Sequence, residues 1–481
     1  MRAADERWPQ VRQAALLAAV HAALIAAIWL TSIAVYAVAF APTRQPAWLA
    51  IDALLVAACL RLVHARRDLL GFSALGPRRP RRLAAIAAWA LACVAISQWL
   101  VVDANAIHLD ELNYLATLRE GRIVRDGLFP FNLRWLEPLL AGPWNVLPLD
   151  DAEALKAINF GGLVVTAVLL VLLLVRLGIR LAPALAAPIF LLASYLGVYA
   201  GQNRLVLDPF NYAMFAVLCH TTLRRDHAWL FGVALLAAAL NSEKAIYWIP
   251  VFGLTAVVRG EPGRLRTWID AARLTLRCCA PTIAYLAAMR IYLLPSDSVS
   301  SLFAEKVHLI SFSWLESDLA SGLVRDNSFQ VLWFPFGAFT IYALLGFTLA
   351  DRERTPLLML LVPIMVSVIV ATDTRRMLAY SFVVYLPFGY LYLARVLDDL
   401  PRRLGAAVFG LVIALVFCEH YLARILDRLG LPPGEPRSLN FALSFAELAL
   451  VPFLVFAHHA FFRPPRAGAL PPPPPATGPP P

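Results

Sequence analysis

Long apolar segments recur along almost the whole chain, and their length limits what the chain can fold into. A helix that crosses a bilayer needs about 20 mostly apolar residues. Segments that approach or exceed this length are 14–40, 47–63, 83–102, 158–175, 183–200, 205–221, 274–294, 331–350, 357–371, 377–394, 405–422 and 441–461. With two shorter stretches in 228–258, the sequence predicts an all-α, polytopic transmembrane helix bundle of about 12–14 spans.

Composition supports this prediction. Of 481 residues, 60% are hydrophobic and 15% are charged. A soluble domain has about 45–50% apolar and about 25% charged residues, so this chain has too little polar surface for a soluble globule of its size. We expect one transmembrane domain over 1–463. The tail 464–481 includes Pro471 to Pro475, cannot pack a core, and is expected to be disordered and cytoplasmic.

The segment 228–258 allows two interpretations. Its apolar stretches 228–240 and 245–258 are separated by Asn241-Ser242-Glu243-Lys244. They form either a hairpin of short helices with its polar tip near one membrane face, or one long kinked helix. Basic residues flank the segment on both sides, at Arg224-Arg225 and from Arg259 onward. Because cytoplasmic loops carry the excess of Lys and Arg, the flanks favour the hairpin.

The same rule orients the chain. The segment 61–82 contains seven arginines and is therefore expected in the cytoplasm. Alternation then places both termini inside, in a multi-pass protein of the inner (plasma) membrane, and places 103–157, 295–330 and 423–440 outside. The loop 103–157 is predicted to carry amphipathic helices on the membrane surface. The net charge of +10 is the sum of many cytoplasmic flanks, so we expect no nucleic-acid partner.

The six cysteines add little to the functional prediction. All of them lie in or at the ends of apolar segments, which argues against a disulfide framework. No Cys/His spacing typical of a metal site occurs, and we expect neither a metal nor another cofactor.

Ionisable residues within or beside spans are costly and are therefore candidates for function. In the topology above they gather at the outer face. They are Asp110, Glu111, Arg204, Asp208, Glu243, Lys244, Asp373, Arg375 and Arg376. We expect them to line a single polar cavity.

Two of these groups lie in the first half of the chain. Asp110, Glu111 and Tyr114 fit the start of a helix, where the dipole favours acids, so a solvated acidic N-terminus is the alternative to a catalytic pair. Arg204 and Asp208 are four residues apart and are expected to share a helix face. Arg204 is then a phosphate ligand, or else an interfacial arginine paired with Asp208.

The other two groups carry more basic residues. Glu243 and Lys244 occupy the tip of the predicted hairpin, where a charged tip facing water is the alternative. Asp373, Arg375 and Arg376 lie on a short outer loop, against the orientation rule. An anionic ligand would account for this loop, and an interfacial anchor is its alternative.

At these residues the chain resembles the GT-C superfamily of polytopic glycosyltransferases, which includes protein O-mannosyltransferases and bacterial lipid A aminoarabinose transferases. The similar features are Asp110-Glu111 followed by Tyr114, and Arg204 followed by Asp208-Pro209. That family often has a Lys-Glu pair and then a proline in the next hairpin; here the order is reversed, Glu243-Lys244, with Pro250 following. The resemblance covers roughly residues 85–400.

The resemblance implies a metal-independent, inverting transfer of a sugar from a polyprenyl-phosphate-linked donor. The acceptor is a hydroxyl of a lipid, glycan or protein at the extracytoplasmic face. It implies that Asp110 is the general base, and that Glu111 orients the acceptor or tunes the electrostatics. Cationic groups stabilise the phosphate leaving group, and the candidates are Arg204, Lys244, Arg375 and Arg376. Tyr114, Asp208, Glu243 and Asp373 are expected to line the same substrate site.

Other classes of protein stay open. A lipid-linked glycan flippase or a secondary transporter would also be polytopic, with charges near the midplane and usually an internal repeat. A polymerase or ligase of O-antigen type would use a large outer loop late in the chain, whereas the largest acidic outer loop here is 103–157. A purely structural membrane protein is a further alternative.

Overall fold

The computed structural model describes twelve parts of the chain. They are residues 79–101, 109–122, 134–142, 150–223, 228–293, 336, 339–351, 354–370, 374–399, 405–407, 409–414 and 421. Within these ranges the regular secondary structure is entirely helical, which confirms the all-α prediction. The predicted spans 14–40, 47–63 and 441–461, the outer loops 295–330 and 423–440, and the tail 464–481 lie outside the described residues.

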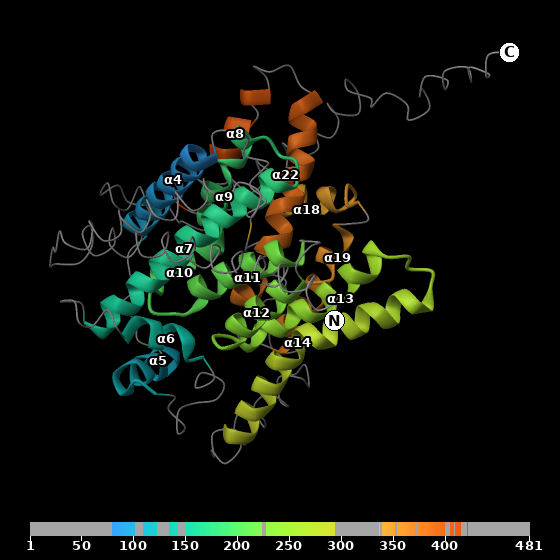
Figure 1. Ribbon diagram of the computed structural model, residues 1–481. Helices are drawn as coiled ribbons and strands as arrows, with labels where there is room; N and C mark the ends of the chain where they lie inside the picture. The colour runs from blue at the N-terminus through green and yellow to red at the C-terminus, as the bar shows by residue number, and fades with distance from the viewer. Residues whose placement is uncertain are drawn as a thin grey trace, which may run out of the picture.

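Figure 1 shows the arrangement of the helices. They are α4 (Arg79–Leu100), α5 (Leu109–Glu120), α6 (Leu136–Ala141), α7 (Asp151–Arg176), α8 (Leu181–Ala184), α9 (Ala187–Ala193), α10 (Tyr195–Gln202), α11 (Asp208–Thr222), α12 (Ala228–Ala239), the 3₁₀ helix η4 (Glu243–Tyr247), α13 (Trp248–Arg259), α14 (Leu265–Leu293), α18 (Phe339–Phe347), α19 (Thr355–Leu358), α20 (Leu361–Val370), α21 (Thr374–Ala379) and α22 (Phe382–Asp399).

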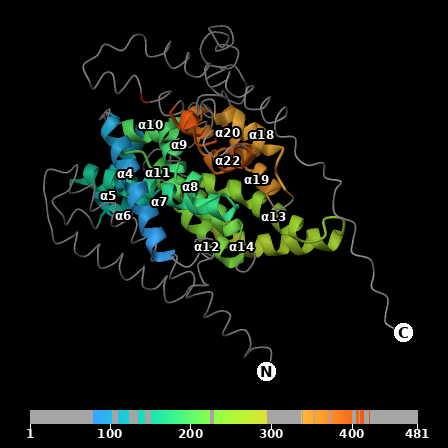
Figure 2. The same cartoon turned by 90° about the horizontal axis from the view of Figure 1, so that it is seen from above.

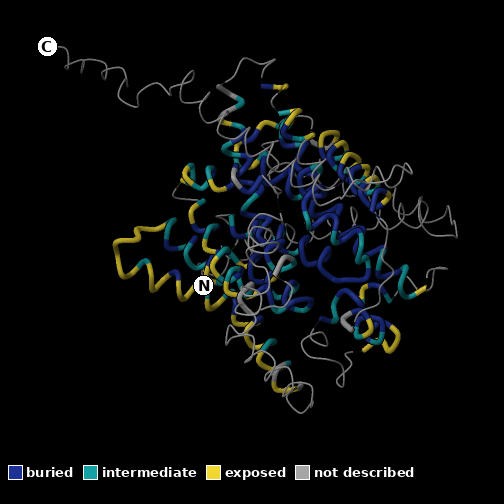
Figure 3. The backbone as a smooth tube through the Cα atoms, turned by 180° about the vertical axis from the view of Figure 1, so that it is seen from behind, coloured by how far each residue is buried: buried dark blue, intermediate teal, exposed yellow. Residues whose placement is uncertain are grey.

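Helix α7 is the central element. Asp150 caps its N-terminus, where the carboxylate accepts a 2.8 Å hydrogen bond from the backbone N–H of Glu153. A cap of this kind contributes about 1 kcal/mol. From Ala157 to Leu174 the helix is almost entirely apolar and buried, and α4, α9 and α11 pack around it. The buried residues in Figure 3 follow these helices, whereas α14 carries a large share of the exposed ones.

Among the residues that the structure describes, two helices are long and apolar enough to cross a membrane, Arg81–Leu100 within α4 and Asp151–Arg176. They coincide with the predicted spans 83–102 and 158–175. A third qualifies if Leu181–Ala193 and Tyr195–Gln202 count as one span, bent by 53°. The predicted span 183–200 therefore corresponds to this bent pair of helices and not to one continuous helix. Pro188 opens α9, and Ser194, which separates α9 from α10, has extended backbone geometry.

The segment 228–258 forms a hairpin. The rings of Phe231 on α12 and Phe252 on α13 stack with their centroids 4.1 Å apart. In one continuous helix these residues would be about 30 Å apart, at 1.5 Å per residue. The hairpin interpretation is therefore confirmed. Most of its tip is buried, since Asn241 is 0% and Lys244 3% exposed, whereas the Glu243 side chain is 33% exposed.

The described parts of the loop 103–157 include the short helices α5 and α6. Helix α5 buries Glu111, Tyr114, Leu115 and Leu118 and leaves Leu112 exposed, so it has one buried face as expected. Figures 1 and 2 agree in placing α5 and α6 on one side of α7 and the pair α13 and α14 on the other. The position of α5 at a membrane surface stays a prediction.

A glycine sets the closest approach between α7 and α11. A Cβ atom at Gly162 would lie 2.7 Å from the carbonyl oxygen of Pro209 and 2.9 Å from the backbone nitrogen of Phe210. Small residues at helix crossings allow backbones to approach this closely. Because α11 begins at Asp208, this contact also fixes the position of that carboxylate.

We therefore expect Gly162→Ala to lower stability by about 1–3 kcal/mol, the usual cost of overpacking a close contact. Gly410→Ala is the matched control, because nothing lies within 4 Å of a Cβ at this helical glycine. The measurement is the thermal unfolding midpoint of each purified variant in detergent. Equal midpoints for the two variants would show that the α7–α11 contact does not constrain the fold.

Candidate functional site

Five charged side chains from segments far apart in the sequence form two neighbouring sets of ion pairs, joined where Glu243 precedes Lys244 in the chain, and we call them together the charge cluster. Asp208 begins α11, Glu243 and Lys244 lie in η4, Arg376 lies in α21, and Arg134 precedes α6. Four of these residues were predicted to share a polar cavity. The structure brings Lys244 and Arg376 to Asp208 and places Glu243 next to Lys244 in the chain, and the shared polar cavity stays a prediction.

Asp208 is the hub of the charge cluster. It is 1% exposed, pairs with Arg376 through Oδ2, and accepts a hydrogen bond from the Tyr380 hydroxyl through Oδ1. The ammonium of Lys244 lies 3.8 Å from Oδ1. Pro209 follows in the first turn of α11, where its missing N–H costs nothing. An isolated buried carboxylate would be strongly unfavourable, so these cations are a condition for burying it.

Arg134 and Glu243 form the second pair of the cluster. The guanidinium donates through Nη2 to Oε1 at 2.7 Å and through Nε to Oε2 at 3.2 Å, a bidentate geometry. Its Nη1 donates to the Tyr114 hydroxyl at 3.2 Å. Burial opposes ionisation of Glu243, but the charge and hydrogen bonds of Arg134 lower its pKa to about 2. Glu243 is 33% exposed and forms the accessible edge of the cluster.

Lys244 is the cation with the longest ion pair in the cluster. Besides Asp208 at 3.8 Å, its ammonium faces the ring of Tyr380 at 4.3 Å from the centroid. Burial, and then the charges of Arg134 and Arg376, lower the pKa of Lys244 to about 8, although Asp208 opposes this shift. At neutral pH Lys244 is charged. The cluster then holds three cations and two carboxylates, a net charge of +1.

A line of buried polar side chains extends from the cluster. Asn211, one turn after Asp208, accepts a 2.9 Å hydrogen bond from Asn241. The side-chain oxygen Oδ1 of Asn241 accepts a 2.9 Å hydrogen bond from the backbone N–H of Glu137. Glu137 is fully buried, and its Oε1 has no hydrogen-bond partner among the described residues. Burial raises the pKa of Glu137 well above its usual range and so favours the neutral form of this carboxyl.

Arg204 does not share a helix face with Asp208, and that prediction is wrong. Arg204 lies in the turn before α11, and its guanidinium donates to three carbonyl oxygens. These belong to Gly201 at 3.1 Å, Gln98 at 2.7 Å and Val101 at 3.1 Å. The last carbonyls of a helix lack intrahelical partners, so Arg204 caps α4. Its predicted contact with phosphate stays a prediction.

The predicted catalytic pair lies on α5. Glu111 is 1% exposed, so the alternative of a solvated acid does not hold for it. Tyr114, three residues further along the same helix face, contacts Arg134 of the charge cluster. Asp110 belongs to the first turn of α5 and Arg375 to α21, but the side chains of these two residues lie outside the described set. Asp373 lies outside the described residues.

Sequence reasoning missed Arg134 and Tyr380. Arg134 is a basic residue in the outer loop 103–157 and meets the same criterion that selected Arg375 and Arg376. Tyr380 is four residues after Arg376, and both reach Asp208. No local pattern marks Glu137, Asn211 or Asn241, because their role depends on the contact between α6, α11 and the hairpin.

The charge cluster is suited to hold an anion. Its fixed cations need no reorganisation to bind negative charge, and burial strengthens electrostatic attraction. Among the residues that the structure describes, no three His, Cys, Asp or Glu side chains are close enough to hold a metal ion. The positive charge of the cluster comes from Arg134, Lys244 and Arg376.

Comparison of the chain with protein-family models, with curated proteins and with solved structures gives no match.

We expect Asp208→Asn to destabilise the protein by about 3–5 kcal/mol, because it leaves two buried cations without their carboxylate. Asp270→Asn is the matched control: its ion pairs with Arg266 and Arg273 are 3.9 and 3.8 Å long, and the Asp270 side chain is 60% exposed. Such surface pairs contribute about 0–1 kcal/mol. Chemical or thermal unfolding in detergent gives the comparison. A small effect for both variants would contradict the role of Asp208 as the hub.

Proposed function

We propose that this chain is a membrane glycosyltransferase that transfers a sugar from a polyprenyl-phosphate-linked donor to an acceptor hydroxyl at the extracytoplasmic face. The observation that carries the proposal is the charge cluster, a buried network with a net charge of +1 and one accessible edge at Glu243. A phosphate diester or monoester is the common anion that such a cluster of Arg and Lys binds.

The topology supplies the second support. In the proposed bundle of about 12–14 spans, with both termini in the cytoplasm, the hairpin tip, the start of α11 and the loop before α22 fall at one membrane face. The charge cluster joins residues from these three places. A lipid donor keeps its chain in the bilayer and its phosphate at that face, so donor and cluster would meet at the same depth.

We assign the donor phosphate to Lys244 and Arg376, with Arg375 as a neighbour. Lys244 has the longest ion pair of the cluster, so its ammonium is the cation that a carboxylate holds least closely. Arg204 is the weaker candidate, because three carbonyl oxygens already hold its guanidinium. Arg134 fixes Glu243 and Tyr114 at the edge of the site.

The proposed reaction is a direct displacement. Asp110 takes the proton from the acceptor hydroxyl, and the acceptor oxygen forms a bond to the anomeric carbon from the side opposite the leaving group. The bond between that carbon and the phosphate oxygen breaks, and the polyprenyl phosphate leaves with the electron pair. Lys244 and Arg376 stabilise the charge that develops on the phosphate. Glu111, on the same helix, orients the acceptor.

The first test concerns the phosphate. Lys244→Met keeps the length of the side chain and removes its charge, and should weaken binding of a long-chain polyprenyl phosphate about 10- to 100-fold. Wild-type affinity should also fall between pH 7 and pH 9, because Lys244 loses its proton above its pKa of about 8. Lys244→Arg stays charged across this range and should lose less affinity.

Native mass spectrometry or thermophoresis in detergent measures these affinities, and unfolding midpoints show that each variant is folded. An affinity that is constant from pH 7 to pH 9 and unchanged in Lys244→Met would remove Lys244 from the site.

The second test concerns the base. Asp110→Asn keeps the shape of the side chain and removes the proton acceptor, so transfer should fall about 10²–10⁴-fold while polyprenyl-phosphate affinity is kept. Glu111→Gln should cost less. The assay is release of polyprenyl phosphate from a panel of labelled sugar donors in membranes. Donor movement across the bilayer without any transfer, in the wild type, would instead identify a flippase.

A further inference from the structure

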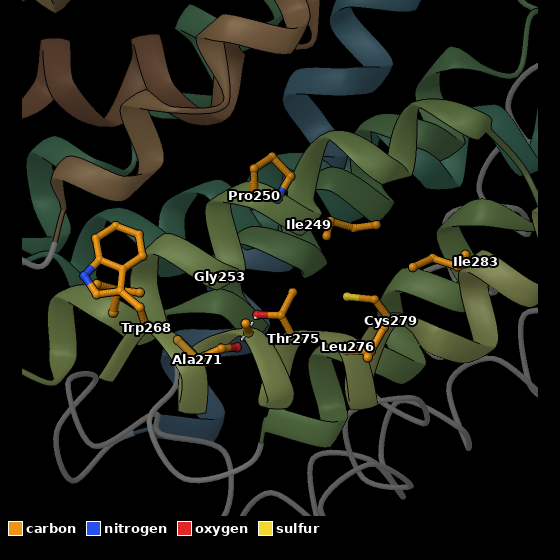
Figure 4. Close-up of a pocket in the computed structure, with 11 residues that line it drawn as sticks. Ile249, Pro250, Gly253, Trp268, Ala271, Thr275, Leu276, Cys279 and Ile283 are labelled. Carbon is orange, nitrogen blue, oxygen red and sulfur yellow. Dashed lines mark hydrogen bonds between the residues drawn. The ribbon is translucent and has the colours of Figure 1, made fainter. Parts of the chain in front are cut away.

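An apolar groove runs between α13 and α14. Its volume is about 430 Å³, and Figure 4 shows residues of both helices along it. Ile249 and Pro250 lie with Cys279 and Ile283 toward one end, and Trp268 lies at the other. Ile283 and Trp268 are fifteen residues apart on α14, which corresponds to a length of about 22 Å.

The side chains that line the groove are mostly apolar, so they offer a ligand van der Waals contact and few hydrogen bonds. Its two side chains with strong hydrogen-bonding groups already have partners. The Thr275 hydroxyl donates to the carbonyl oxygen of Ala271 at 2.8 Å, and the Trp268 indole N–H donates to that of Pro262 at 2.8 Å. The apolar rim is open, since Trp268 is 48%, Leu276 63% and Ile283 46% exposed. A contiguous exposed apolar surface marks a binding site or a membrane contact.

One end of the groove adjoins the charge cluster through the chain itself. Lys244 lies in η4, α13 begins directly after η4 at Trp248, and Ile249 is the next residue. At the rise of a 3₁₀ and then an α-helix, five residues span about 9 Å. The nearest groove residue along the chain, Ile249, therefore lies within reach of the first isoprene units of a lipid whose phosphate binds at Lys244.

We propose that the groove between α13 and α14 holds the polyprenyl chain of the donor, with its phosphate at Lys244 and its isoprene units running along α13 toward Trp268. This inference rests on the proposed function, because it takes the anion at Lys244 to be a lipid phosphate. Charge at one end and an apolar channel leading away from it match an amphiphile with a single anionic head. A free phosphate or a soluble sugar phosphate would leave the groove empty.

Gly253 keeps the middle of the groove open. A Cβ at this position would already lie 3.2 Å from the Thr275 hydroxyl oxygen, which is tighter than ordinary contact. A larger side chain at this position would crowd Thr275 of α14 and take up space in the groove. Gly253→Leu therefore blocks the channel without touching the charge cluster.

The test compares two probes, a long-chain polyprenyl phosphate and geranyl phosphate, whose chain is too short to reach Gly253. Gly253→Leu should weaken binding of the long-chain probe about tenfold or more and change binding of geranyl phosphate less than about twofold. Gly410→Leu is the matched control: it makes the same change at an exposed helical glycine with nothing within 4 Å, and should affect neither probe.

The outcomes separate the groove from the cluster. If Gly253→Leu binds both probes as the wild type does, the groove is not the chain site, while the proposed phosphate site stands. If it loses both probes and its unfolding midpoint is normal, the groove is not selective for the chain, and the inference is overturned. If the wild type binds neither probe, the result contradicts the proposed function and, because it rests on that function, this inference as well.

Discussion

The buried carboxylate of Asp208 is the interaction on which the rest of the site depends. It draws Arg376, Lys244 and the Tyr380 hydroxyl to one point, so that α11, the hairpin tip and the break between α21 and α22 are held together. A carboxylate that is 1% exposed needs this many partners, because its desolvation exceeds what one ion pair returns. Gly162 makes the arrangement possible by letting the start of α11 approach α7 closely.

Sequence patterns predicted the features that depend on residues close together in the chain, namely the hairpin and most members of the charge cluster. The polar tip between 228–240 and 245–258 indicated a hairpin, because each apolar stretch is short for a full span. Basic residues flank the whole segment on both sides, so both ends are expected on the cytoplasmic side of the membrane. The charged residues beside spans identified four of the five members of the charge cluster, because charge near a membrane is rare unless it has a partner or a use.

What the sequence could not predict depends on contacts between distant segments. Spacing placed Arg204 on the face of Asp208, but α11 begins only at Asp208, and the carbonyl ends of α4 bind the guanidinium instead. Arg134 lies in the loop 103–157, and the hydrophobic periodicity of that loop does not predict where its side chains lie. The expected span 183–200 has apolar composition throughout, yet Pro183, Pro188 and Ser194 divide it into three short helices.

The protonation state of Glu137 affects the net charge at the charge cluster. Glu137 lies beyond Asn241 and Asn211, close enough to Asp208 for that charge to contribute to the high pKa of Glu137. An ionised Glu137 would add a third negative charge to the three cations and two carboxylates and bring the total to zero. Burial raises the pKa of Glu137 and so favours its neutral form, which leaves the cluster its excess of positive charge. The same apolar packing that surrounds the line Glu137–Asn241–Asn211 thus preserves the electrostatic attraction that an incoming phosphate would experience at Lys244.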